Sequence, residues 1–292
     1  MLKLPLGLKE NKLWGVDHVG GGLTCQCICP GCKQPLVARK GKKKAHHFAH
    51  YQIGECNSGL ETTLHLLAKT LLKQARCIVL PPLICNITDR ILKPAKKIHF
   101  DHIKTEVRLG NFTPDLVVEV GNHRLLLEIG VTHFCPSAKL ERLEERGEAV
   151  LEINAGAIME TAWKTGQIFD VELFKTILLY KPDHKEWLFH PGRAAWESRL
   201  FDGAEVKKVK RWSRGARKSY WVNGCPEKHL TQADEEYWHG GNAGVFSDCI
   251  HCPYCLEVLY HEDRRGGHGV KTYPLQVICG AREFKRLVHG ER

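Results

Sequence analysis

Two groups of cysteine and histidine residues, one near each end of the chain, have the spacing of metal-binding sites. The 292 residues include 13 cysteines, of which five lie within Cys25–Cys56 and five within Cys225–Cys279. The cysteine count is odd and several cysteines form C-x-C or C-x-x-C pairs, which favours metal ligands over a disulfide framework. The other three cysteines, Cys77, Cys85 and Cys135, are isolated among apolar residues, so we expect them to pack as small hydrophobic side chains.

The N-terminal group combines a C-x2-C pair with a following H-x2-H pair. Together these pairs offer the four sulfur and nitrogen ligands that tetrahedral Zn²⁺ prefers, and Pro30-Gly31 suits the tight turn between the two thiolates. The predicted zinc ligands are Cys29, Cys32, His47 and His50. Four further residues carry the same donor atoms and could replace any of them: Cys25, Cys27, His46 and Cys56.

The C-terminal group has three cysteines at a spacing of three, together with two distant partners in Cys-Pro and Cys-Gly pairs. Two such knuckles can pair across the intervening chain to hold one zinc ion. The predicted ligands are Cys225, Cys249, Cys252 and Cys279, and Cys255 is the alternative ligand. We therefore expect two zinc ions per chain.

Two basic segments lie beside these groups. The first, Arg39–Lys44, includes Lys42, Lys43 and Lys44, and the second, Val206–Tyr220, alternates cations with aromatic residues. Cations that meet phosphates and aromatics that stack on bases are typical of a nucleic-acid groove, whereas a solvated loop is the alternative. In the second segment the predicted DNA-binding residues are Lys207, Lys208, Lys210, Arg211, Trp212, Arg214, Arg217 and Lys218.

Two carboxylates stand out among apolar residues between these ends. Asp115 begins the segment DLVVEV and Glu128 lies within RLLLEIGV. Carboxylates in such surroundings are costly unless they are paired or bind a cation, and hard oxygen ligands suit Mg²⁺ or Mn²⁺. The alternative is that Asp115 caps a turn while Glu128 forms a salt bridge with Arg124 or Lys139.

The helices and strands predicted to position these residues alternate in the order of a mixed α/β fold. A capping box at Ser58–Glu61 predicts a helix to about residue 75, with Leu60, Leu64, Leu67 and Leu71 on its buried face. Glu61, His65 and Lys69 form a polar stripe that is either an exposed ladder or directed at a site. The remaining predicted elements are strands 98–109, 115–120 and 124–131, a helix over 136–146 and a strand over 149–154.

Charge and composition are consistent with three regions. Residues 1–60 carry a net charge of +6, residues 61–180 a net charge of zero and residues 181–292 a net charge of +4, which gives +10 overall. We predict an N-terminal zinc module at 1–57, a central domain at 58–180 and a C-terminal basic region with a zinc-ribbon-like module at 181–292. No apolar run approaches the roughly 18–20 residues of a membrane span and no secretory signal is evident, so we expect a cytoplasmic protein.

Together, these segments resemble the competence-protein CoiA-like family, a branch of the PD-(D/E)XK nuclease superfamily. The resemblance rests on CQCICPGC with AHHFAH, ECNSGLETTLHLLAK, NFTPDLVVEVGNHRLLLEIGVTHF and VLEIN, about half of the chain. It implies a PD-(D/E)XK nuclease-like mixed sheet core (αβββαβ), flanked here by two small zinc-binding modules. DNA is the implied substrate, with Mg²⁺ or Mn²⁺ as the catalytic ion.

The resemblance also implies roles for individual residues. Asp115 and Glu128 correspond to the metal-binding carboxylates, the carbonyl of Ile129 to a third ligand, and Glu106 and Glu61 to auxiliary ligands. The lysine of the motif is replaced by Gly130. We expect Lys139 to supply the missing cation, with Lys69 as the alternative and His133 as a weaker candidate for proton transfer.

The function predicted from these residues is metal-dependent hydrolysis of DNA, in DNA processing or in defence against foreign DNA. Other DNA-processing or defence proteins are candidate partners. The alternative is a DNA-binding protein of the competence type that assists recombination without cleavage, because glycine cannot orient water or stabilise charge.

Overall fold

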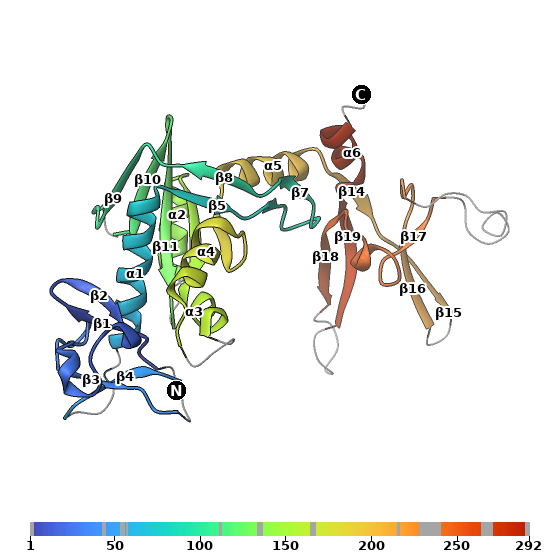
Figure 1. The fold of residues 1–292 in the computed structure, drawn as a ribbon. Helices are drawn as coiled ribbons and strands as arrows, with labels where there is room; N and C mark the ends of the chain where they lie inside the picture. The colour runs from blue at the N-terminus through green and yellow to red at the C-terminus, as the bar shows by residue number, and fades with distance from the viewer. Residues whose placement is uncertain are drawn as a thin grey trace. The chain divides into compact units, whose positions relative to one another are not determined.

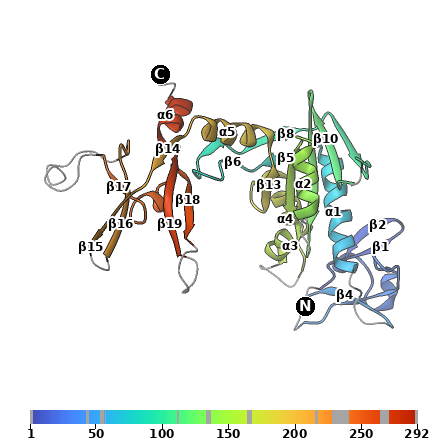
Figure 2. The same cartoon turned by 180° about the vertical axis from the view of Figure 1, so that it is seen from behind.

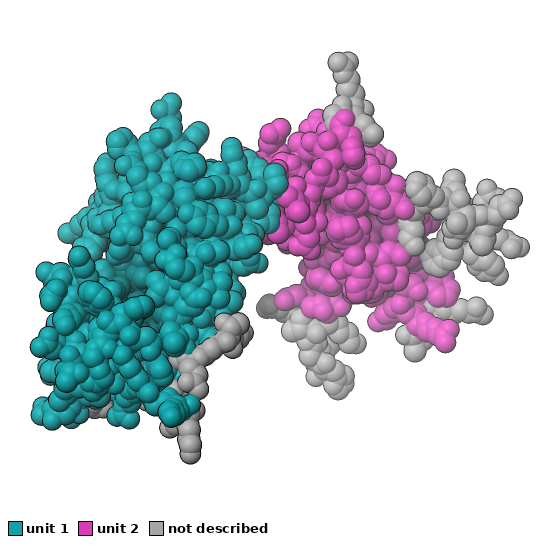
Figure 3. All heavy atoms as spheres, viewed as in Figure 1, with its two compact units in different colours: residues 1–83, 93–191 teal, residues 84–92, 192–292 magenta. Residues whose placement is uncertain are grey.

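The computed structural model describes residues 3–42, 45–52, 56, 58–110, 113–132, 137–163, 168–214, 217–227, 241–263 and 271–289. The side chains of residues 137–140, 214, 263 and 271 lie outside this description. The chain forms two compact units: residues 1–83 with 93–191, and residues 84–92 with 192–292 (Figure 3). Each unit is described by itself below.

A five-stranded mixed sheet forms the centre of the first unit (Figure 1). Its order is β13-β12-β11-β10-β9, and only β11 and β12 run parallel. The strands are β9 (His102–Thr105), β10 (Leu116–Val120), β11 (His123–Gly130), β12 (Ala149–Asn154) and β13 (Lys185–Phe189). The hairpin of β10 and β11 turns at Gly121, whose φ of +56° suits glycine.

Helices cover both faces of this sheet. Helix α2 (Ser137–Glu145) lies on one face (Figure 2). There Leu143 packs against Val117, Leu126 and Val150. Three other helices pack together, with α3 also contacting β11: α1 (Gly59–Ala75), α3 (Ala155–Trp163) and α4 (Val171–Tyr180). The sheet strands are apolar on both faces because helices lie on both sides.

Small two-stranded sheets complete the first unit. The N-terminal part comprises β1 (Leu6–Lys9) with β2 (Lys12–Gly15), β3 (Leu36–Arg39) with β4 (His47–His50), and the short 3-10 helices η1 (Val16–His18) and η2 (Leu23–Cys25). Further along lies β5 (Cys77–Leu80) with β8 (Lys96–His99). Strand β6 (Leu83–Ile84) pairs with β7 (Ile91–Lys93), and most of this pair is assigned to the second unit.

The second unit contains two three-stranded sheets, ordered β14-β19-β18 and β15-β16-β17. The strands are β14 (Glu205–Lys208), β15 (Lys210–Arg214), β16 (Arg217–Val222), β17 (Ala243–Gly244), β18 (Cys255–Asp263) and β19 (Lys271–Cys279). The helices are α5 (Pro191–Asp202), η4 (Cys249–His251) and α6 (Ala281–His289). Phe284 joins them by ring contacts with Trp196 and Tyr254, at centroid distances of 5.8 and 4.8 Å.

The predicted helix-strand order is largely confirmed, with three differences. The expected strand over 98–109 is two strands, β8 and β9, which pair with different partners. Ser58 makes no side-chain cap at α1, so the predicted capping box is wrong. The sheet also gains a strand beyond residue 180, because β13 pairs with β12. Among the described residues, no helix is long and apolar enough to cross a membrane.

Candidate metal and catalytic sites

The N-terminal module brings three sulfurs and one imidazole together. The ligand atoms of Cys29, Cys32, His50 and Cys56 all lie within 4.8 Å of one another. Cys32 Sγ is 3.2 Å from His50 Nε2, and Cys29 Sγ is 3.7 Å from Cys56 Sγ. A tetrahedral zinc ion with bonds of roughly 2.3 Å to sulfur needs sulfurs roughly 3.8 Å apart, so this donor set fits zinc.

The predicted ligand His47 does not belong to this set, and Cys56 takes its place. His47 and His50 are three residues apart on β4, and strand side chains alternate between faces, so the two rings point to opposite sides. His47 Nδ1 instead lies 2.7 Å from the Ala45 carbonyl. The H-x2-H pair therefore supplies one ligand rather than two.

Close approach of α1 to the sulfurs depends on Gly59. A Cβ atom at this position would lie 2.9 Å from Cys56 Sγ and 3.0 Å from Cys29 Sγ. Although burial raises the pKa of Cys56, hydrogen bonds from Cys32 and Cys29, from the Gly59 N–H and from Ser58 outweigh burial and lower it. Burial raises the pKa of the Cys29 thiol to about 12, against the effect of N–H donors from Cys32 and Gly31. The backbone thus already points donors at the sulfurs, as around a bound thiolate.

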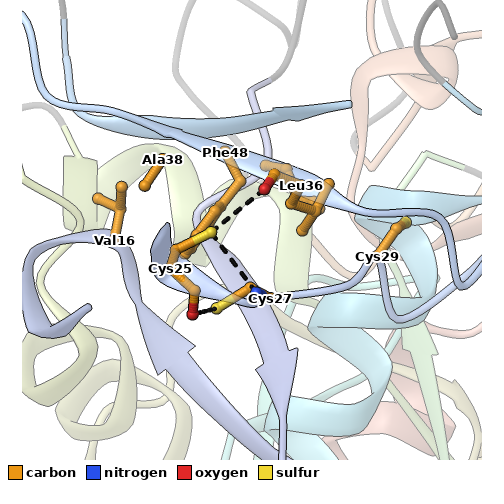
Figure 4. Packing of buried hydrophobic residues seen from close by; sticks show 8 residues of the cluster. Val16, Cys25, Cys27, Cys29, Leu36, Ala38 and Phe48 are labelled. Carbon is orange, nitrogen blue, oxygen red and sulfur yellow. Dashed lines mark hydrogen bonds between the residues drawn. The ribbon is translucent and has the colours of Figure 1, made fainter. Parts of the chain in front are cut away.

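The other N-terminal residues with suitable donors have different roles. Cys25 and Cys27 are buried in the core with Val16, Ala38 and Phe48 (Figure 4). Their thiols donate to the carbonyls of Leu36 and Cys25, at 3.2 and 3.4 Å. Burial, followed by the effect of Cys25, raises the pKa of Cys27 to about 12. His46 Nδ1 lies 2.6 Å from Asp17 Oδ1.

The central carboxylate site is built by α1 and the β10–β11 hairpin. Asp115 immediately precedes β10, and the pair Leu116–Leu127 places it beside the position of Glu128 on β11. Asp115 Oδ1 accepts from Lys69 Nζ at 2.9 Å and lies 3.2 Å from His65 Nδ1. Asp115 Oδ2 accepts from the Ile129 N–H at 2.9 Å. The polar stripe on α1 is therefore directed at the carboxylate.

This environment keeps Asp115 ionised. Burial raises its pKa, but hydrogen bonds from His65 and Lys69, the His65 charge and the Ile129 N–H together hold it well below its usual range. A carboxylate offers about four acceptor positions, of which three are used, so capacity for a cation remains. Glu128 is only 7% exposed and adds a second carboxylate at the same strand end. Hard oxygen ligands of this kind suit Mg²⁺, but among the described residues it is the N-terminal Cys3His group that brings three or more ligand atoms within 4.8 Å of one another.

Four other residues predicted for this site are either in different surroundings or outside the described residues. Glu61 Oε1 lies 3.9 Å from His65 Nε2 and its other oxygen accepts from Thr132 at 3.0 Å, so it borders the site. Glu106 follows the end of β9, is exposed and makes no ion pair within the described part of the chain. The side chain of Lys139 and the whole of His133 lie outside the described residues. Of the two lysines considered, Lys69 is the one with a described contact to Asp115.

Sequence reasoning missed Glu152 on β12. It pairs with Glu128 across parallel strands, so both side chains point to the same face, and it is 9% exposed. The alternative pairing of Glu128 with Arg124 is wrong, because Arg124 pairs with Glu148. The signal for Glu152 was its position among apolar residues in AVLEIN, the same pattern that marked Glu128.

All five C-terminal cysteines line one cavity of about 260 Å³ in the second unit. The cavity wall also includes Lys207, Asp248 and Val277. Burial raises the pKa of Cys249 to about 12, and the neighbouring Cys255, Cys225, Cys252 and Cys279 contribute in that order. The predicted four and the alternative ligand are therefore neighbours.

The predicted DNA-binding residues divide into exposed and enclosed members. Lys42 is exposed, whereas Lys43, Lys44 and the side chain of Arg214 lie outside the described residues. The exposed cations and aromatic side chain of the second segment are Lys208, Lys210, Arg211, Trp212, Arg217 and Lys218. Lys207 differs: its side chain is 11% exposed, and Nζ donates to Glu205 at 2.7 Å and to the Gly224 carbonyl at 2.9 Å. It is a structural cation rather than a phosphate ligand.

Comparison with known proteins identifies the N-terminal module alone. Residues 24–59 match the family model described as competence protein CoiA, N-terminal domain. This segment is similar to that domain. The match includes all four residues of the Cys3His group. Searches of curated proteins and of solved structures found no match.

Proposed function

We propose that this protein is a Mg²⁺- or Mn²⁺-dependent deoxyribonuclease of the CoiA-like, PD-(D/E)XK type. The observation that carries the proposal is Lys69, whose Nζ lies 2.9 Å from Asp115 at the strand end where Glu128 is also buried. Two acidic residues and one lysine at a strand end are the combination that the resemblance implies. Lys69 on α1 supplies the cation that Gly130 cannot.

The residues divide the chemistry as follows. Asp115, Glu128 and the Ile129 carbonyl would hold the divalent ion, which polarises the scissile phosphate and lowers the pKa of water when bound. Lys69 keeps Asp115 ionised and offers an ammonium group to a phosphate oxygen or to the attacking water. His65 contacts the same Asp115 oxygen as Lys69, and Glu61 lies 3.9 Å from the other side of the His65 ring. His65 and Glu61 therefore orient the Asp115 carboxylate.

The proposal is tested by cleavage of single-stranded, duplex and branched DNA with Mg²⁺ or Mn²⁺. Asp115→Asn and Glu128→Gln should each abolish cleavage. Glu119→Gln is the matched control, because Glu119 lies on the same hairpin, is partly exposed and pairs with Lys104. Cleavage that survives both site substitutions would exclude this site as the catalytic centre.

A second candidate function is DNA binding without cleavage, in support of recombination. Gly130 at the position of the motif lysine favours it, as does the match to a competence-protein domain. This candidate predicts DNA binding in every divalent ion with no hydrolysis in any of them. In that case Lys69 stabilises Asp115 without acting on a phosphate.

A further inference from the structure

The C-terminal cavity brings together cysteines from four separate places in the chain. Cys225 follows β16, Cys249 and Cys252 lie at η4, Cys255 begins β18 and Cys279 ends β19. All five are free thiols, and all five line the same cavity. Folding therefore converges these side chains on one small volume.

The backbone around these cysteines forms tight turns. The Cys252 N–H donates to the Cys249 carbonyl at 3.0 Å, and the Cys255 N–H donates to the Cys252 carbonyl at 3.0 Å. Two successive turns thus bring three cysteines close together along the chain, although their sulfurs do not all lie within 4.8 Å of one another, as the ligand atoms of the N-terminal Cys3His group do. The Cys225 N–H donates to the Gly241 carbonyl, and both Gly224 and Gly241 have positive φ.

Cys255 is placed as favourably as Cys279. The two residues face each other across β18 and β19, and the sulfur of each interacts with the backbone two residues further on, at Glu257 and Ala281 respectively. Cys255 is therefore as good a candidate zinc ligand as the four cysteines predicted from the sequence.

A packing role alone does not account for this cluster. Cys249 is buried in a small core with Val222, Ala243, Val245 and Val277, and Cys225 and Cys255 pack against this core, but Cys252 and Cys279 are not among the described residues that form it. Several thiolates in one site repel one another unless a cation compensates them, and a zinc tetrathiolate still carries an excess of about two negative charges. Lys207 lines the same cavity, so it can offset part of that charge.

We propose that the second unit holds its own zinc ion, bound by four thiolates from the set Cys225, Cys249, Cys252, Cys255 and Cys279. The ion joins the sheet β15-β16-β17, through Cys225, to the sheet β14-β19-β18, through Cys255 and Cys279. It thereby fixes the basic hairpin of β15 and β16. This proposal does not depend on the nuclease proposal.

The test is the zinc content of the full-length protein together with the ligands of each ion. Wild type should contain two zinc ions per chain. Cys249→Ser/Cys252→Ser leaves only three of the five cysteines and should contain one. Cys77→Ser is the control, because Cys77 is a buried thiol on β5 outside both clusters, and this variant should retain two. One zinc ion in wild type, or two in Cys249→Ser/Cys252→Ser, would overturn the proposal.

A second measurement remains informative if Cys249→Ser/Cys252→Ser fails to fold. The double variant Cys32→Ser/Cys56→Ser removes two N-terminal ligands and leaves the C-terminal cavity unchanged. X-ray absorption at the zinc edge should then show one ion with four sulfur ligands and no nitrogen. Loss of all zinc from this folded variant, or a nitrogen ligand on the remaining ion, would contradict the proposed site.

Discussion

Lys69 and Asp115 form the central contact of the carboxylate site at the scale of single residues. The lysine comes from a helix rather than from the strand that carries Glu128. Its ammonium is 2.9 Å from Asp115 Oδ1 and lowers the cost of burying that acid. Lys69 therefore has a structural role at Asp115, to which the proposed nuclease would add a chemical one.

Replacement of Lys69 separates these roles. Lys69→Met should lower kcat for DNA cleavage by about 10²–10³-fold, the usual cost of removing one electrostatic donor from a catalytic site. Lys73→Met is the matched control, since Lys73 lies one turn further along α1 and donates to Thr105 at 3.2 Å. Single-turnover cleavage at saturating Mg²⁺ measures both. Equal rates for the two variants would assign Lys69 a purely structural role.

A second prediction about single residues follows from the Cys3His group, which contains Cys56 and not the predicted ligand His47. Cys56→Ala should lower the zinc content by one ion per chain, because it removes a ligand from the Cys3His group. His47→Ala should leave the zinc content unchanged, because its ring bonds to the Ala45 carbonyl. Elemental analysis of the purified variants distinguishes the two residues. Zinc loss from His47→Ala with retention in Cys56→Ala would restore the ligand set expected from sequence.

Sequence patterns identified residue types better than their partners. Cys29, Cys32 and His50 belong, as expected, to the Cys3His group that could hold a metal, and Asp115 lies next to the position of Glu128. His47 was misassigned because spacing along the chain takes no account of the alternation of a strand. Glu152 was missed because its proximity to Glu128 arises only when two distant strands pair in parallel.

At the scale of elements, the periodicity of the sequence predicted where strands and helices lie better than it predicted which strands pair with each other. The strand 149–154 and the turn at Gly121 are as predicted, since each depends on local sequence alone. The separation of β8 from β9 and the addition of β13 depend on long-range pairing. Ser58 has a capping sequence, yet its hydroxyl interacts with Cys56 instead of capping the helix.

Lys185 is a buried lysine that donates to carbonyls at the C-terminus of α4, and its titration makes the free energy of unfolding depend on pH. Lys185 Nζ donates to the carbonyls of Ile177 and Lys181, and burial lowers its pKa from 10.5 to about 8, with Asp183 opposing this. Between about pH 8 and 10.5 the unfolded chain keeps the proton that the folded chain releases. The free energy of unfolding from this group therefore rises with pH in that window.

This dependence is measurable by difference. The rise in unfolding free energy between pH 8 and 10.5 should be about 1–3 kcal/mol larger in wild type than in Lys185→Met, because methionine does not titrate. Lys175→Met is the control, since Lys175 lies on α4, the helix whose C-terminal carbonyls Lys185 contacts, and pairs with Glu172 at 3.0 Å. Urea titrations at each pH supply the free energies. Parallel curves for wild type and Lys185→Met would show that Lys185 has an ordinary pKa.

At the scale of the whole molecule, positive charge is concentrated outside the central region. Residues 61–180 carry no net charge, whereas residues 181–292 carry +4. The hairpin of β15 and β16 places Lys210 and Trp212 on one face, and alternation puts Arg217 and Trp221 on the same face. On the other face Tyr220 packs against Phe246, and Arg211 lies over Tyr273. If the protein binds DNA as proposed, we therefore expect the first face to make the contact.

Salt dependence tests this surface. Lys210→Ala/Arg217→Ala should weaken DNA binding and lower the slope of log K against log[salt] by about two, because each phosphate contact contributes about 0.7–0.9. Arg193→Ala/Arg199→Ala is the control, since it removes the same charge from α5 in the same unit. Fluorescence anisotropy from 50 to 300 mM salt supplies the slopes. A slope that both double variants lower equally would assign binding to net charge rather than to this face.

Helix α1 begins three residues after Cys56 of the Cys3His group and carries Glu61, His65 and Lys69 towards Asp115. Ten residues separate Gly59 from Lys69, which corresponds to about 15 Å of helix at 1.5 Å per residue. One continuous helix therefore connects a group that could hold a metal to the lysine that contacts Asp115. A metal ion bound by the Cys3His group would fix the start of this helix, and with it the position of Lys69 beside Asp115.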